Sequence, residues 1–339
     1  MISRPLPLFA GASLAYGAAV RLREAAFASG FLPVRRASGI CVVSVGNLRA
    51  GGSGKTPLAM FLAGAIARAG VPTALVTRGY RGSMERTGGV VSRGSGPLAG
   101  PEQAGDEAFL AAVRLPGVTV LAGGNRFASA VRAASQGLKV AILDDGFQHR
   151  HLHRDLDILL ACPQDLDPAT RLLPLGPLRE PSSAASRAHL VGGLTEDWGQ
   201  GDPGFLFSLV PECLVDFGWK PHPLDAERGA RAFLLSGIAR PSRFARTVRD
   251  AGFDVAGHAA FPDHHRFTAS DLTRVGREAR DLCASLVLTT EKDLARGFLH
   301  TGGPPLFAMR VSVRLARGSD RLASLLTRAI GDNSPLSFS

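Results

Sequence analysis

A glycine-rich stretch near the N-terminus has the residue types of a phosphate-binding loop. It follows the apolar run 40–45 and precedes an amphipathic stretch, 57–68, that predicts a helix. Glycines let main-chain N–H groups approach a phosphate closely, and the helix adds the positive end of its dipole. We predict that a nucleoside triphosphate binds here, with Lys55 on the β- and γ-phosphates and Thr56 on Mg²⁺. The predicted loop comprises Arg49, Ala50, Gly51, Gly52, Ser53, Gly54, Lys55 and Thr56.

This loop departs from the usual G-x-x-x-x-G-K-T spacing at one position, because Arg49 stands where the first glycine is expected. The alternative is a glycine-rich turn that ends in Lys-Thr by chance. The order of strand, loop and helix favours the phosphate-binding interpretation.

A second polar motif, Asp-Asp-Gly-Phe-Gln-His-Arg at residues 144–150, follows the apolar run 140–143. A carboxylate at the end of a buried strand, opposite a phosphate-binding loop, is a common way to hold Mg²⁺ through its water shell. Two adjacent carboxylates repel each other unless a cation lies nearby. We therefore predict Asp144 and Asp145 as Mg²⁺ ligands, whereas a simple polar turn would account for one aspartate only.

Two acidic residues open the predicted helix 106–114. A helix start explains both of them, with Asp106 as the N-cap and Glu107 favoured in the first turn. A kinase that acts on a hydroxyl group also needs a carboxylate near the acceptor oxygen to take its proton. On the residues alone both interpretations stay open, and Asp106 is the candidate base.

Two histidines lie beside an aspartate in the predicted loop 261–267. Lone histidines are usually structural, but Asp263, His264 and His265 together favour catalysis or substrate binding. The spacing does not indicate zinc, because no cysteine or third histidine lies nearby in the sequence.

Arginines supply candidate phosphate contacts. Arg179 lies in the rigid, proline-punctuated segment 172–181 and suits bidentate contact with phosphate. Arg78, Arg81 and Arg126 could serve in the same way, although each alone is a weak signal in an arginine-rich chain.

Strand-like and helix-like segments alternate along the first two thirds of the chain. Apolar runs at 74–77, 118–121, 140–143 and 155–161 are separated by predicted helices, and a Gly/Ser/Arg-rich loop covers 78–100. This order predicts an α/β fold with a P-loop NTPase-like parallel sheet and helices on both faces. Ligands of such sheets bind at the carboxyl ends of the strands, where the candidate residues fall.

The pattern changes after residue 205. Two short extended pieces between 205 and 219 suggest a linking hairpin, and a second, smaller α/β unit begins near 232. We expect four parts: an N-terminal membrane-associated helix (1–36), a P-loop nucleotide-binding domain (37–208), a linker (209–230) and a C-terminal α/β domain that contributes to the substrate cleft (231–331). The tail beyond Gly331 is expected to fray.

Composition bounds the possible partners. The formal net charge of +10 in 339 residues, most of it from arginine, favours phosphates, nucleic acid or an anionic membrane. No arginine-rich helix with interleaved aromatic residues supports nucleic acid, so we expect none as a partner. The four cysteines are scattered and indicate neither a disulfide framework nor a zinc site.

The N-terminus is apolar over residues 5–20 and is followed by several arginines. Sixteen residues are short for a membrane span, which takes about 20. The phosphate-binding loop follows too closely for a signal peptide. We interpret residues 5–32 as a helix that touches or shallowly enters a membrane rich in anionic headgroups. The alternative is a helix that covers the main core.

These motifs together resemble the tetraacyldisaccharide 4'-kinase family, the lipid A 4'-kinases of Gram-negative bacteria. The resemblance runs in family order from Ser44 to Arg296. Its most specific parts are DDGFQHR and PLGPLREP; the others are SVGNLRAGGSGKTP, TRGYRG, GDEAF, FPDHHRF and LTTEKDLAR.

The resemblance implies ATP- and Mg²⁺-dependent phosphorylation of the 4'-hydroxyl of tetraacyldisaccharide 1-phosphate, which gives lipid IVA. It also implies a monotopic protein at the cytoplasmic face of the inner membrane, and we expect a monomer. The family's base falls on Asp106 and its assisting histidine on His264. Family contacts to Mg²⁺ and nucleotide fall on Lys55, Thr56, Glu107, Asp144 and Asp145. Arg126, Arg179 and Glu180 match further active-site positions of the family, and Arg78, His149 and Asp263 are our additional candidates for substrate contact. Ala108 departs from the proline that is common in the family after Gly-Asp-Glu.

Two other functions fit parts of the sequence. A P-loop GTPase switch or metal-delivery protein would share the loop, and 290–293 (Thr-Glu-Lys-Asp) superficially resembles a guanine-reading motif. A non-catalytic membrane adaptor that binds phosphates would share the loop and the basic charge. The nucleotide preference and acceptor-dependent ADP release distinguish these functions from a kinase.

Overall fold

The computed structural model describes residues 7–297 and 302–331 together with 336 and 338. The start of the predicted N-terminal helix and most of the tail beyond Gly331 lie outside these residues. Within them, no helix is both long and apolar enough to cross a membrane.

The larger part of the molecule contains the predicted parallel sheet, with strands in the order β7–β6–β1–β5–β2–β4–β3. Its neighbours are parallel except at the edge, where β3 is antiparallel to β4. The strands are β1 (Cys41–Asn47), β2 (Thr73–Thr77), β3 (Gly89–Arg93), β4 (Thr119–Ala122), β5 (Val140–Asp144), β6 (Leu156–Leu160) and β7 (Leu190–Leu194). Strand β3 lies inside the segment that the sequence analysis assigned entirely to a loop.

Helices cover both faces of this sheet, which confirms the predicted fold class. Apolar side chains of α2, α5 and α11 pack on one face, and those of α6 pack on the other. The helices here are α2 (Lys55–Arg68), α3 (Met84–Thr87), α4 (Pro101–Ala104), α5 (Asp106–Arg114), α6 (Arg126–Ser135), α7 (Thr195–Trp198) and α11 (Ser319–Ile330), with 3-10 turns η1 (Pro163–Asp165) and η2 (Ser182–Arg187).

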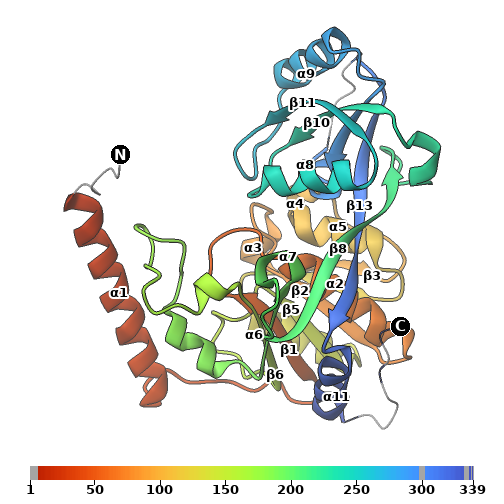
Figure 1. Ribbon diagram of the computed structural model, residues 1–339. Helices are drawn as coiled ribbons and strands as arrows, with labels where there is room; N and C mark the ends of the chain where they lie inside the picture. Colours follow the sequence, from red (N-terminus) through yellow and green to blue (C-terminus); the bar gives the residue numbers. More distant parts are fainter. Residues whose placement is uncertain (1–6, 298–301, 332–335, 337, 339) are drawn as a thin grey trace.

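Two long strands connect this part to the rest of the molecule (Figure 1). Strand β8 (Gly204–Val215) begins parallel to β7 and continues antiparallel to β13 (Leu306–Arg317), and the short β9 (Pro221–His222) pairs with its end. The predicted hairpin of two short pieces was therefore wrong. Pro211, which lies between the two predicted pieces, is where the register with β13 shifts, and such a bulge tolerates proline.

The smaller part is a second α/β unit, as predicted. Parallel strands β10 (Arg231–Ser236), β11 (Asp254–Ala260) and β12 (Leu286–Thr290) continue the same sheet beyond β13. Helix α8 (Pro241–Asp250) packs on one face and α9 (Ala269–Asp281) on the other. The turn η3 (Leu224–Glu227) precedes β10, and α10 (Glu291–Leu294) follows β12 directly.

Helix α1 (Pro7–Ala28) lies along one side of the larger part (Figure 1). One face contacts the body of the molecule, whereas Leu14 and Leu22 on the other face are 76% and 73% exposed. Helix α1 therefore packs against the larger part with one face and leaves apolar side chains exposed on the other, and its contact with a membrane stays a prediction.

Candidate active site

The phosphate-binding loop connects the end of β1 to the start of α2. Gly54 is the N-cap of α2 and has φ +81°, and Gly51 has φ +109°. An L side chain rarely adopts these conformations, so both positions favour glycine. The loop thus combines glycine backbone with a helix N-terminus, an arrangement suited to an anion.

Asn47, the last residue of β1, braces this loop. Its amide nitrogen donates to Ser53 Oγ at 2.8 Å, and its Oδ1 accepts from Lys55 Nζ at 3.0 Å. The side chain of Arg49 turns away and pairs through Nε with Asp165 at 2.7 Å. Arg49 therefore has its main chain, but not its guanidinium, available for a phosphate.

Asp144 lies beside the loop because β1 and β5 are neighbours in register, with Val45 opposite Asp144. Thr56 Oγ1 donates to Asp144 Oδ2 at 2.8 Å, while the buried Asp144 Oδ1 has no hydrogen-bond partner within the described structure. Burial, followed by the nearby charge of Glu107, raises the pKa of Asp144 to about 7. A divalent cation would satisfy the free oxygen and favour the ionised carboxylate, so these residues fit Mg²⁺.

Asp145 has a different environment from its neighbour. Arg179 makes a bidentate contact with it at 2.8 and 2.9 Å, and Lys55 Nζ lies 3.6 Å away. Burial works in the opposite direction, but these two cations hold the pKa of Asp145 below its ordinary value. The two adjacent aspartates thus differ in charge compensation. Arg179 and Lys55 compensate the charge of Asp145, whereas Asp144 remains available to another cation.

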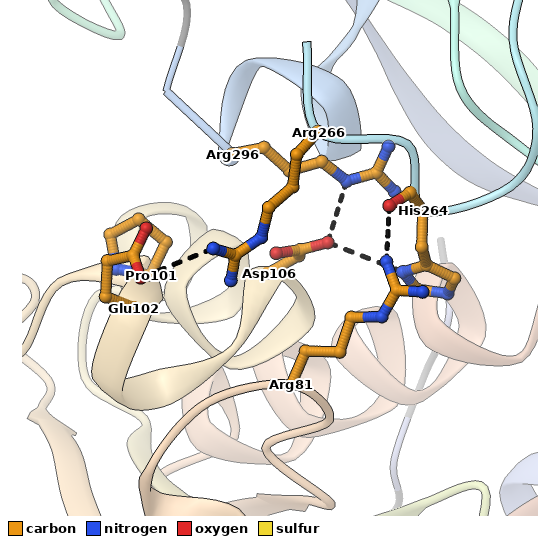
Figure 2. A pocket seen from close by; sticks show the side chains of 7 residues that line it. All are labelled: Arg81, Pro101, Glu102, Asp106, His264, Arg266 and Arg296. Atoms are coloured by element: carbon orange, nitrogen blue, oxygen red, sulfur yellow. Dashed lines mark hydrogen bonds and ion pairs between the residues drawn. The ribbon is translucent and has the colours of Figure 1, made fainter. Parts of the chain in front are cut away.

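Asp106 lies at the other side of the site, where the two α/β parts meet (Figure 2). Gly105 is the N-cap of α5 and Asp106 is the first helical residue, so the capping explanation for Asp106 was wrong. His264 Nδ1 lies 3.5 Å from Asp106 Oδ2, and Arg296 Nε donates to the same oxygen at 2.7 Å. Although burial opposes it, contact with His264 and Arg296 lowers the pKa of Asp106 to about 2. The carboxylate is therefore ionised at neutral pH.

Strained backbone is concentrated in this region. Among the described residues, five non-glycine residues have positive φ, and Arg81, Asp145 and His264 are three of them. Such conformations persist only where the surroundings enforce them. His264 is fixed through its main chain, since its N–H donates to Gly237 and its carbonyl accepts from the guanidinium of Arg81.

Comparison with known proteins decides the family. Residues 6–331 match the family described as tetraacyldisaccharide-1-P 4'-kinase. The chain belongs to this family. It is 41% identical over 344 residues to the tetraacyldisaccharide 4'-kinase of Anaeromyxobacter sp. (strain Fw109-5), covering 96% of this chain and 91% of that protein. It is 42% identical over 349 residues to that of Anaeromyxobacter dehalogenans (strain 2CP-C), covering 95% and 91%.

A solved kinase of this family has the same fold. The crystal structure of LpxK from Aquifex aeolicus in complex with ATP superposes with a TM-score of 0.78 at 32% sequence identity. The likeness covers 96% of this chain and 99% of that one. The family resemblance predicted from the motifs is therefore confirmed along nearly the whole chain.

Two cationic residues without a predicted role, Lys292 and Arg296, also lie at this candidate site. Lys292 Nζ lies 3.2 Å from Glu107 Oε1 and 3.3 Å from His264 Nε2. Arg296, whose side chain is 4% exposed, links Asp106 to the buried Asp293. Both cations come from the LTTEKDLAR motif, which was quoted for the resemblance without residue roles. Their proximity to acidic residues almost 190 positions earlier has no local sequence signal.

The remaining predicted residues differ in burial and in their hydrogen-bond and ion-pair partners. Arg126 is buried behind Asp144 and donates to the main-chain carbonyls of Gly123 and Asp144. Glu180 is buried and pairs with Arg187, not with its neighbour Arg179. The other three are Arg78, which is largely exposed and pairs with Glu85; His149, whose pKa is lowered to about 4 by burial and by Arg126; and Asp263, 3.9 Å from His264 Nε2.

Proposed function

We propose that this protein transfers the γ-phosphate of ATP to the 4'-hydroxyl of tetraacyldisaccharide 1-phosphate and so forms lipid IVA in lipid A biosynthesis. The observation that best supports this proposal is the combination of three features in one site. They are the phosphate-binding loop, the buried Asp144 with a free oxygen, and the ionised Asp106 opposite them. The chain's membership in the 4'-kinase family supplies the identity of the acceptor.

In this proposal the main-chain N–H groups of residues 51–56 hold the ATP phosphates, and Lys55 contacts the β- and γ-phosphates. Thr56, Asp144 and Glu107 would hold Mg²⁺, which would neutralise charge on the transferred phosphoryl group. Asp145, also predicted as a ligand, is not retained because Arg179 already pairs with it. Arg179 and Lys55 together keep Asp145 ionised and fixed. The contact of Lys292 with Glu107 holds this carboxylate toward the site.

Asp106 accepts the proton of the 4'-hydroxyl as that oxygen attacks the γ-phosphorus. The lowered pKa keeps Asp106 ionised, so that its carboxylate can accept a hydrogen bond from the hydroxyl, and the position of Asp106 opposite the loop, not its basicity, supports this role. His264 and Arg296 orient Asp106 from the other α/β part. Catalysis therefore needs both parts together, in line with closure of the two α/β parts around the sugar. Of the proposed domain 231–331, helix α11 packs with the larger part, 37–208.

The substrate class suggests where the protein works. We propose that it is a monomer at the cytoplasmic face of the inner membrane, in contact with lipid through the exposed face of α1. The exposed Leu14 and Leu22, and beyond the helix Phe31 and Val34, supply apolar surface. The formal charge of +10 favours anionic headgroups and an anionic lipid substrate.

The structure gives no support to a GTPase switch. In a guanine-reading motif the aspartate must face the base, but Asp293 is fully buried and hydrogen-bonded by Thr290 and the main-chain N–H of Gly237. Glu291 is also buried and pairs with Arg114 and Arg310. The resemblance of 290–293 to that motif is therefore superficial.

The decisive experiment supplies labelled ATP and tetraacyldisaccharide 1-phosphate in mixed micelles and locates the new phosphate by fragmentation mass spectrometry. We expect acceptor-dependent ADP release and a single phosphate at the 4'-position, with GTP a poor substitute. Phosphorylation elsewhere on the sugar, or ADP release that is independent of the acceptor, would contradict the proposal.

Arg296→Lys is expected to lower kcat about 10- to 100-fold, because a small displacement of a catalytic group has an effect of this order. Lysine keeps a positive charge opposite Asp293. Its single ammonium cannot contact Asp106 and Asp293 at the same time, whereas the planar guanidinium of Arg296 does. Steady-state kinetics should show KM for ATP unchanged. Arg274→Lys, at an exposed pair with Glu278, is the matched control; an equal loss in both variants would contradict the positioning role.

A further inference from the structure

One face of α1 is fixed to the body of the protein by polar contacts. Ser13 Oγ donates to the carbonyl of Leu172 at 3.2 Å, and Tyr16 Oη donates to the carbonyl of Arg179 at 2.8 Å. Nearer the end of the helix, Arg23 donates to the carbonyl of Gln148, and Glu24 pairs with Arg187. These positions recur at helical spacing, and all but the exposed Arg23 are partly buried.

The segment that receives the contacts from Ser13 and Tyr16 also pairs with the phosphate-binding loop. The N–H of Arg179 donates to the carbonyl of Leu48 at 2.7 Å, and the N–H of Ala50 donates to the carbonyl of Pro177 at 2.9 Å. Residues 177–179 are therefore held between α1 on one side and the start of the loop on the other. In this short stretch the N–H of Arg179 is bound by the loop and its carbonyl by Tyr16.

The side chain of Arg179 connects the segment 177–179 to residues of the candidate nucleotide site. Its guanidinium holds Asp145 in bidentate contact and also donates to Asn47. Asn47 Oδ1 in turn accepts from Lys55 at 3.0 Å. A displacement of the Arg179 main chain would thus move the groups that orient Lys55 and Asp145.

A second series of hydrogen bonds leads from α1 to Asn47. Arg23 Nη2 donates to the carbonyl of Gln148 at 2.7 Å, and Gln148 Nε2 donates to the carbonyl of Asn47 at 2.9 Å. Both routes from α1 end at Asn47, the last residue of β1.

We propose that Tyr16 is a positioning residue for ATP use: through the carbonyl of Arg179 it fixes the segment 177–179 and thereby the groups around Lys55. The proposal rests on the proposed function. It gives α1 a second role, because the face opposite its exposed apolar side chains helps to shape the nucleotide site. Packing of α1 against the larger part and binding of ATP are then coupled, so that each favours the other.

The test is Tyr16→Phe, which keeps the ring and removes only the hydroxyl. Loss of one such hydrogen bond predicts an increase in KM for ATP, and in the equilibrium Kd for ATP without acceptor, of about three- to tenfold. KM for the lipid acceptor and association with vesicles of phosphatidylethanolamine and phosphatidylglycerol should stay at the wild-type values. The thermal midpoint reports whether the fold is retained.

Ser29→Ala is the matched control, since it removes a hydroxyl beyond the end of α1 that donates only to the nearby carbonyl of Ala26. It should leave the Kd for ATP unchanged. An unchanged Kd in Tyr16→Phe would overturn the proposal, and so would a change in vesicle association or lipid KM in place of the ATP effect. Failure of the wild-type protein to bind ATP would instead contradict the proposed function, so the two failures are distinguishable.

Discussion

Asp106→Asn is expected to lower kcat by about 10²- to 10⁴-fold, the range for removal of a general base. Asparagine has nearly the same shape and still accepts a hydrogen bond from Arg296, but it cannot take a proton from the acceptor hydroxyl. Arg296 remains paired with Asp293, so no buried charge is left alone. Steady-state kinetics with the tetraacyldisaccharide acceptor, together with equilibrium binding of ATP, measure the effect.

The binding measurement separates a base from a nucleotide ligand. Asp106 makes no contact with the loop 49–56 among its recorded partners, which are His264 and Arg296. We therefore expect the Kd for ATP to be unchanged. Asp250→Asn, at the exposed end of α8, is the control for loss of a carboxylate. Near wild-type turnover in Asp106→Asn would show that another group takes the proton.

Lys55→Ala is expected to lower kcat/KM for ATP by about 10²- to 10³-fold, the size seen when one preorganised charge-stabilising group is removed. Lys55 is the first residue of α2, and its ammonium lies between Asn47 and Asp145 at 3.0 and 3.6 Å. Its removal takes from the loop the ammonium that would contact the β- and γ-phosphates, while Asp145 keeps its pairing with Arg179. Kinetics with varied ATP and direct binding of a fluorescent ATP analogue both report the loss.

The matched control for this variant is Lys139→Ala, which removes an exposed lysine at the start of β5. It should behave as the wild type in both assays. If Lys55→Ala kept its kcat and its KM for ATP, the interpretation of 49–56 as the nucleotide site would be wrong. A loss of ATP binding with a normal thermal midpoint supports it.

Sequence reasoning performed best where a function depends on consecutive residues. The loop 49–56 lies between a strand and a helix, and the helix 106–114 has the predicted bounds. Their signals are local: glycines, apolar periodicity and terminal residues. Strands β3 and β8 are among the elements that were predicted incorrectly. Strand β3 is an edge strand with weak apolar content, and β8 is continuous because its bulge accommodates Pro211.

For the site, too, features with a local sequence signal were predicted and features that depend on tertiary packing were not. The sequence by itself determined the chemistry that is available, namely the loop with Lys55 and Thr56, the aspartates at the end of β5, and the Asp106 and His264 candidates. Local backbone preference and strand-end position are sufficient to predict these, and the motifs were specific enough to indicate the family.

Only the tertiary structure decided which charges meet. Arg179 pairs with Asp145 and not with Glu180, while Arg296 and Lys292 reach Asp106 and Glu107 across the contact between the two α/β parts. Tyr16 likewise meets Arg179 from 163 positions away. Such pairings depend on strand order and on how the parts pack, and ion pairs of this kind leave no periodic pattern in the chain. The sequence therefore determined the reactive groups, and the packing of distant segments determined their electrostatic state and orientation.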